Sequence, residues 1–150
     1  TEKGDIMERN KTSKKRIYLR TCHAFNLRQA NLAVNALYDK HLQETGLTVQ
    51  QYSVLGHIKS LGPLSITELS LEMNLDRTTL SRNITLLERR RLVETVPSAG
   101  RKHVVQLTEV GVKLFLQAQI AWQAAQDELE KRLGKEGIAQ LENLLLRIIK

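Results

Sequence analysis

The chain has 150 residues, of which 41% are hydrophobic, enough to bury the core of one compact domain. Lys and Arg outnumber Asp and Glu by 23 to 16, a net charge of +7 that favours a polyanionic partner. No apolar run approaches the roughly 20 residues of a membrane span, so we expect a cytoplasmic protein. An aromatic content of 4% disfavours stacking of side chains on the bases of single-stranded nucleic acid, so we expect duplex DNA as the partner.

The basic charge is concentrated in two segments. Residues 1–20 hold 7 Lys and Arg against 3 Asp and Glu, and residues 77–102 hold 7 against 2. Residues 21–76 and 103–150 hold 3 against 5 and 6 against 6. Residues 1–16 carry almost no apolar pattern and are predicted to be a flexible basic arm, followed by a single domain over 17–150. The central basic segment is therefore the expected contact surface.

Two helices are predicted before the central segment. The first covers about 17–45 and ends at Gly46. Its apolar stripe is narrow and includes one weak member: Leu27, Ala30, Val34, Leu37 and His41. Thr48 and Gln51 have the spacing of a capping box, which begins a second helix that extends to about Leu61.

A helix-turn-helix is predicted next. Ser65 and Glu68 form a second capping-box pattern and begin a helix of barely two turns. Asn74 can stop this helix in the left-handed conformation, and Asp76 is a good N-cap for a helix from Arg77 to about Arg91. Two helices joined by so short a turn must cross steeply, which is typical of a helix-turn-helix whose second helix enters the major groove.

The second helix of this pair carries DNA-reading chemistry on its open face. Thr78, Ser81, Thr85 and Arg89 share that face with Arg82, which can donate two hydrogen bonds to a guanine. Ser65 and Thr67 of the shorter helix join the predicted DNA-binding residues. The alternative is a short pair of core helices with a solvated polar face.

A β-hairpin is predicted directly afterwards. Leu92–Val96 and Lys102–Leu107 are rich in β-branched residues and flank the turn sequence at 97–100. Its tip carries Arg101 and Lys102, which we expect to reach the adjacent minor groove or the phosphates. The alternative is an ordinary charged turn. The DNA-binding lobe then covers about 48–108.

The C-terminal region, about 109–150, is predicted to form dimerisation helices together with 17–45. Thr108 caps a long helix to about Leu133, a break covers Gly134–Gly137, and a last helix follows. Its apolar side chains have heptad spacing: Ile138, Leu141, Leu145 and Ile148. Because one small lobe cannot cover this surface, we expect a homodimer on a pseudo-palindromic DNA site; the alternative is a monomer that folds these helices on itself.

Several stretches between Cys22 and Lys150 resemble the MarR family of bacterial regulators: LTVQQYSVL, SITELSLEMNLDRTTLSRNITLLERRRLV and RKHVVQLTEVG. The resemblance implies a mainly α fold, a winged helix-turn-helix dimer joined by its first and last helices. It also implies repression of a promoter until a small-molecule effector or an oxidant intervenes. Thr78, Thr79, Ser81, Arg82 and Thr85 would then line the major groove, and Arg101 would enter the minor groove. Ala99 stands where the family usually has an Asp, which leaves Arg101 less firmly held.

Other chemistry is weakly supported by the sequence. The stretch around Cys22 resembles a peroxide-sensing subgroup, but Ala24 replaces its second cysteine. A thiol-based oxidant sensor therefore stays an alternative to a packed cysteine, as does a winged-helix protein-interaction module. No spacing predicts a metal site, a cofactor or catalysis. Effector-contacting residues are not determined by the sequence. Four side chains could contribute to an effector pocket or simply pack: Tyr38, Tyr52, His57 and Trp122.

Overall fold

The computed structural model describes residues 21–150, apart from the side chain of Arg101. The predicted flexible arm at 1–16 and the predicted helix start at 17–20 lie outside these residues. Internal contacts divide the chain into two compact units, one ending at Leu37 and one covering Tyr38–Lys150. The second unit holds every element of the predicted DNA-binding lobe.

Helix α2 covers His23–Leu42 and is followed by the 3-10 turn η1 at Gln43–Thr45. Gly46 ends this segment with φ of 67°, and its N–H donates to the carbonyl of Gln43. Glycine adopts this left-handed conformation at little cost. The helix end predicted at Gly46 is therefore confirmed.

Three helices follow: α3 at Val49–Leu61, α4 at Ile66–Glu72 and α5 at Arg77–Arg89. Both predicted capping boxes are present, with Thr48 and Ser65 as the capping residues. Helix α5 ends two residues earlier than predicted. The reason is the backbone of Arg91, whose φ of 56° is incompatible with a continuing right-handed helix.

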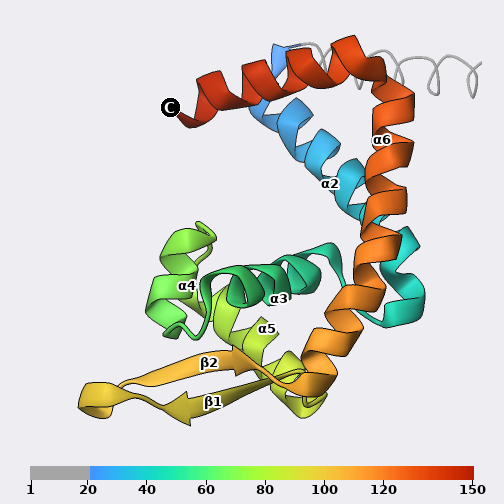
Figure 1. The fold of residues 1–150 in the computed structure, drawn as a ribbon. Helices are drawn as coiled ribbons and strands as arrows, with labels where there is room; N and C mark the ends of the chain where they lie inside the picture. Colours follow the sequence, from blue (N-terminus) through green and yellow to red (C-terminus); the bar gives the residue numbers. More distant parts are fainter. Residues whose placement is uncertain (1–20) are drawn as a thin grey trace, which may run out of the picture. The chain divides into compact units, whose positions relative to one another are not determined.

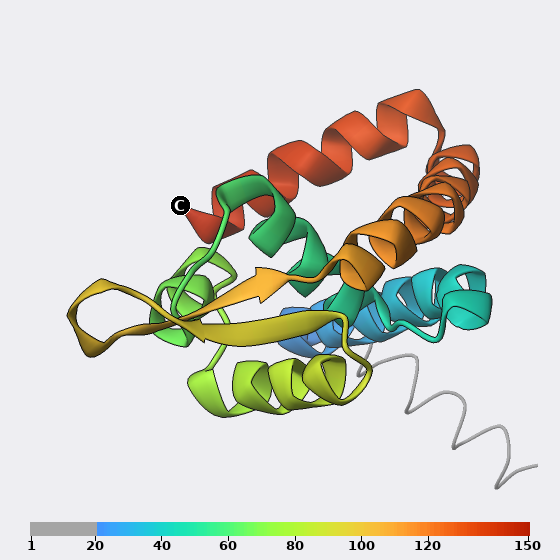
Figure 2. The same cartoon turned by 60° about the horizontal axis from the view of Figure 1, so that its bottom comes forward.

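The hairpin consists of β1 at Val93–Pro97 and β2 at His103–Leu107, each close to its predicted bounds. The strands are antiparallel, with Val93 opposite Leu107. Figure 2 shows the hairpin extending beyond the helices, with α5 running beside β1. Leu64 forms an additional bridge to Val105 through two backbone hydrogen bonds of 2.7 and 3.2 Å. This bridge was not predicted from sequence, because a single paired residue has no period-two pattern.

One hydrophobic core holds α3, α4, α5 and the hairpin together. Each of these elements contributes a fully buried side chain, so the helix-turn-helix and the wing share one packed interior. The largest of these side chains are Leu55, Ile58, Leu69, Leu80, Leu87, Val54 and Val105. Packing of this kind fixes the position of α5 against α4 and β1.

Helix α6 covers Glu109–Ile149 and begins with Thr108 as its N-cap, whose hydroxyl accepts from the N–H of Gly111. The helix is interrupted at Gly134, with φ of 71° and ψ of 166°, and changes direction there (Figure 1). The predicted break is confirmed but is confined to one residue, because the helix resumes at once. Beyond it, large apolar side chains remain exposed: Leu144, Leu145, Leu146, Ile148 and Ile149.

Candidate nucleic-acid interface

The turn between α4 and α5 is built from residues that end one helix and begin the next. Asn74 adopts a left-handed φ of 50°, a conformation that asparagine tolerates. Asp76 then caps α5: its carboxylate accepts from the N–H of Thr79 at 2.8 Å and from the hydroxyl of Thr79 at 2.5 Å. These hydrogen bonds lower the pKa of Asp76, because they favour the charged form. The predicted helix-turn-helix is present.

Helix α5 has one buried face and one open face. Leu80, Ile84 and Leu87 are buried, and their spacing of four and three residues places them on one side. The opposite side forms a hollow of about 730 Å³, and every residue that lines it belongs to α5. Because one helix makes the whole hollow, it is an open surface suited to a large partner. It is lined by Arg77, Thr78, Ser81, Arg82, Thr85, Leu86 and Arg89.

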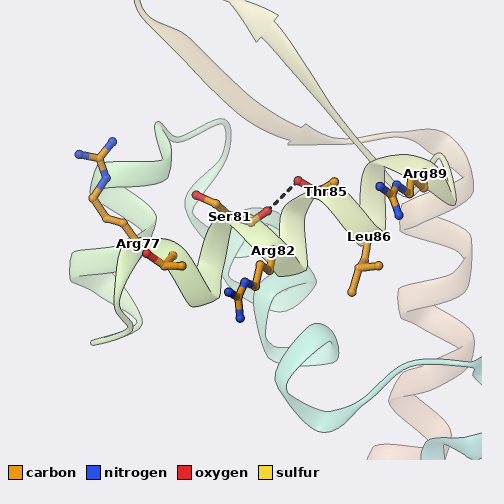
Figure 3. A pocket seen from close by; sticks show the side chains of 7 residues that line it. Arg77, Ser81, Arg82, Thr85, Leu86 and Arg89 are labelled. Carbon is orange, nitrogen blue, oxygen red and sulfur yellow. Dashed lines mark hydrogen bonds between the residues drawn. The ribbon is translucent and has the colours of Figure 1, made fainter.

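The open face is positively charged and rich in hydroxyl groups. Figure 3 shows Arg77 and Arg89 at opposite ends, with Arg82 and Leu86 between them projecting to one side. The hydroxyl of Thr85 donates to the carbonyl of Ser81 at 2.9 Å, so its oxygen remains available as an acceptor and its methyl as an apolar contact. None of the seven lining residues is acidic. This chemistry matches phosphates and base edges.

The wing adds a second basic position. At its tip the N–H of Ser98 donates to the carbonyl of Lys102 at 2.7 Å, which closes the turn around η2 at Ala99–Arg101. Lys102 is exposed. Hydrogen bonds from Ser65 lower the pKa of Glu68, and the charge of Lys102 lowers it further. The backbone of Arg101 lies at the tip, but its side chain is outside the described part of the chain.

The structure brings four predicted DNA-binding residues onto one face, and they are Thr78, Ser81, Arg82 and Thr85. The hydroxyls of Thr79 and Ser65 are instead held by carboxylates. The hydroxyl of Thr79 donates to Asp76, and that of Ser65 donates to Glu68 at 2.7 Å. Thr67 is exposed on α4.

Arg89 lies on the open face, as predicted. Two further residues of this face, Arg77 and Leu86, were not predicted there. Arg77 precedes Ser81 by four positions, and Leu86 follows Arg82 by four. Helical periodicity alone places them beside the predicted residues.

Cys22 immediately precedes α2 and is half-buried. Within residues 21–150, no group of three or more His, Cys, Asp or Glu side chains is arranged to hold a metal ion. No helix in the same part of the chain is long and apolar enough to cross a membrane.

The fold and site define a winged helix-turn-helix protein with a basic recognition helix. Residues 45–102 match the family model described as MarR family. The multiple antibiotic resistance protein MarR of Escherichia coli K12 is 27% identical over 126 residues, which cover 82% of this chain and 88% of that protein.

Solved structures agree with this match. A mutant of E. coli MarR complexed with operator DNA has a TM-score of 0.80 and 26% identity, covering 89% of this chain and 98% of that chain. The Mycobacterium tuberculosis transcriptional regulator MosR has a TM-score of 0.72 and 29% identity, covering 87% and 96%. The chain is therefore similar to MarR-family transcriptional regulators in sequence over residues 45–102 and in fold over most of its length.

Proposed function

We propose that this protein is a sequence-specific regulator that binds double-stranded DNA and represses transcription until a small-molecule effector releases it. The observation that carries the proposal is the exposed face of α5, which presents three Arg and three hydroxyl side chains on the second helix of a helix-turn-helix. Such a helix is positioned to enter the major groove. The solved complex of the related MarR with operator DNA supports this assignment.

Within this proposal, the residues of α5 have distinct roles. Arg82 donates to a guanine edge, and the hydroxyls of Thr78, Ser81 and Thr85 contact bases or phosphates. Thr79 has a lesser, backbone-positioning role, because its hydroxyl is held by Asp76. Ser65 has a similar lesser role, because Glu68 holds its hydroxyl. Thr67 is exposed near the start of α4, where its hydroxyl suits a phosphate.

The wing contacts the DNA beside the major groove. Lys102 is exposed and supplies a cation without a fixed geometry, so it binds phosphate as a point charge. Arg101 enters the minor groove, as the family resemblance implies. The wing and α5 share one core, and we therefore assign both to a DNA-binding lobe of about 48–108.

The active form is a homodimer. The last turns of α6 expose a run of leucine and isoleucine side chains, with Ile148 and Ile149 62% and 79% exposed. Exposed apolar surface of this kind is stabilised by association. Two copies related by a two-fold axis present two α5 helices, which fits a pseudo-palindromic operator with half-sites about one helical turn apart.

The regulator acts in the cytoplasm and has no catalytic role in this proposal. Its effector acts by binding more tightly to the arrangement that does not fit DNA, since only a difference in affinity can shift the equilibrium. Regulation is therefore a property of binding equilibria and needs no chemical step.

The test is fluorescence anisotropy with a labelled duplex from upstream of the protein's own gene and a scrambled duplex of the same length, over a series of salt concentrations. We expect saturable binding to the upstream duplex, stronger than to the scrambled one, and a steep loss of affinity as salt rises. Equal, weak binding to both duplexes, and to duplexes from neighbouring promoters, would contradict the proposal.

A further inference from the structure

One leucine lies among the polar side chains on the open face of α5. Among the seven described residues that line the hollow on this face, Leu86 alone has no polar atom. Leu86 is 45% exposed, whereas its neighbour Leu87 is fully buried. Leu86 is also not one of the partly buried side chains that pack against the core. Packing in the core therefore does not explain why a leucine stands at this position.

Leu86 lies beside the residue that we assign to a guanine. It follows Arg82 by four positions, and the two side chains project to the same side of α5 (Figure 3). Four residues correspond to a rise of about 6 Å along an α-helix, whereas successive base pairs are about 3.4 Å apart. With α5 in the major groove, Leu86 therefore reaches a base edge about one to two base pairs from this guanine.

The chemistry of leucine limits what it can recognise in the groove. Its side chain has no hydrogen-bond donor or acceptor, so it cannot bond to a phosphate or to a polar base edge. The apolar group that the bases present in the major groove is the C5 methyl of thymine. An amino group of adenine or cytosine that faced Leu86 would lose water without gaining a hydrogen bond. The thymine methyl is thus the group in the groove that Leu86 fits best.

We infer that Leu86 is a specificity-determining residue that binds the C5 methyl group of a thymine beside the guanine read by Arg82. The inference rests on the proposed function. Arg82 selects guanine through hydrogen bonds, and Leu86 adds selection for thymine by burying a methyl group. Each half-site of the operator therefore contains both bases, about one to two base pairs apart.

The test replaces the thymines of the upstream duplex by uracil, one position at a time. Uracil lacks the C5 methyl and keeps the hydrogen-bonding groups of thymine, so only the apolar contact is removed. Each duplex is titrated with the full chain by fluorescence anisotropy. We expect uracil at the position that Leu86 contacts to weaken binding about four-fold, the factor that corresponds to burial of one methyl group.

The same duplexes are then titrated with two variants of Leu86. In Leu86→Ala the uracil substitution should have no effect, because the methyl group has lost its partner. Leu86→Met should retain most of the effect, because methionine is apolar and of similar volume. Since Leu86 is 45% exposed, both variants are expected to fold, which urea denaturation checks.

Thr85→Ser and Leu116→Ala are the matched controls. Thr85→Ser removes the neighbouring methyl group and keeps the hydroxyl, and consecutive residues of a helix point about 100° apart. Leu116→Ala truncates a leucine of α6 that is 49% exposed and lies outside the hollow. Both controls should retain the uracil effect at the position that Leu86 contacts. Loss of the effect in either control would overturn the assignment to Leu86.

The remaining outcomes separate this inference from the proposed function. If the chain prefers the upstream duplex to the scrambled one and no uracil substitution weakens binding, the inference alone is overturned. It is also overturned if Leu86→Ala weakens binding to the thymine and uracil duplexes by the same factor, because Leu86 then supports α5 without reading the methyl group. If the chain prefers neither the upstream duplex nor those from neighbouring promoters, the proposed function fails and the inference fails with it.

Discussion

Arg82 is the residue expected to contribute most to sequence discrimination. It is exposed in the middle of the open face of α5 and its planar guanidinium can donate two hydrogen bonds to guanine. Arg82→Ala should reduce the free-energy difference between operator and random DNA by about 1–3 kcal/mol. Anisotropy titrations on both duplexes measure this difference.

Lys102→Ala is the control for Arg82→Ala. Because a lysine on the wing contacts phosphate in our proposal, its loss should weaken binding to both duplexes by a similar factor and reduce the salt dependence. Equal losses on both duplexes for the Arg82 variant would refute its base-reading role.

Arg91 holds a backbone conformation that costs stability. Its φ is 56°, and side chains other than glycine pay roughly 1–2 kcal/mol in the left-handed region. Arg91→Gly should therefore raise the free energy of unfolding by about 1 kcal/mol, measured by urea denaturation. Asn74→Gly is the matched control at φ of 50°, and it should gain less because asparagine tolerates this region. An unchanged or lowered urea midpoint for Arg91→Gly would show that the strain is absent.

At the scale of elements, the end of the recognition helix is tied to the turn after α2. The Arg90 guanidinium, at the C-cap of α5, donates to the carbonyl of Gly46 at 2.7 Å and to that of Thr45 at 3.0 Å. A cation beside the last carbonyls of a helical segment is also favoured by the helix dipole. The arrangement joins α5 to η1 without any buried charge.

Arg90→Ala should lower the free energy of unfolding by about 1 kcal/mol, the typical net value of such hydrogen bonds. Arg89→Ala is its control, because Arg89 lies on the open face and makes no hydrogen bond or ion pair within residues 21–150. That variant should keep its urea midpoint and lose DNA affinity. A stability loss in the Arg89 variant and none in the Arg90 variant would contradict this assignment.

At the scale of the whole molecule, three carboxylates make stability depend on acid pH. Hydrogen bonds lower the pKa of Glu68 and Asp76, and hydrogen bonds from His41 and Arg132 lower that of Glu128. The unfolded chain therefore binds more protons than the folded chain, and stability rises with pH in this range. These carboxylates contribute fully to the free energy of unfolding when the pH is above their ordinary pKa values of 3.8 for Asp and 4.5 for Glu. The contribution is lost as the pH falls through the lower pKa values of the folded chain.

We expect the urea midpoint to fall as the pH is lowered from about 5 to about 3. Asp76→Asn should reduce this dependence, because asparagine also caps a helix but does not titrate in this range. Glu142→Gln, at an exposed position, should not. A midpoint that stays constant or rises as the pH is lowered would contradict the stabilising role of these ionised carboxylates.

The dimer can be tested at the exposed end of α6. Ile148→Glu places a charge where the side chain is already 62% exposed, so it should barely change the stability of a single copy. It should prevent a second copy from packing there and give a monomer in sedimentation velocity. Val110→Glu, at a position 57% exposed near the start of the same helix, should sediment like the unmodified chain. A dimer that persists in the Ile148 variant would place the interface elsewhere.

The sequence by itself determined the local elements of this protein. Capping residues such as Thr48, Ser65 and Asp76 satisfy backbone groups within four residues, and Gly46 and Gly134 adopt conformations that depend on their own lack of a side chain. Apolar periodicity then separated the buried and open faces of α5. Such features depend on neighbours along the chain, and they were predictable for that reason.

Only the tertiary structure decided which distant parts of the chain meet. The Leu64 bridge to Val105, the Arg90 contact with Gly46 and the stack of Tyr52 on Phe115 join residues more than 40 positions apart. Contacts at such separation depend on how the core packs in three dimensions, and no local pattern encodes them.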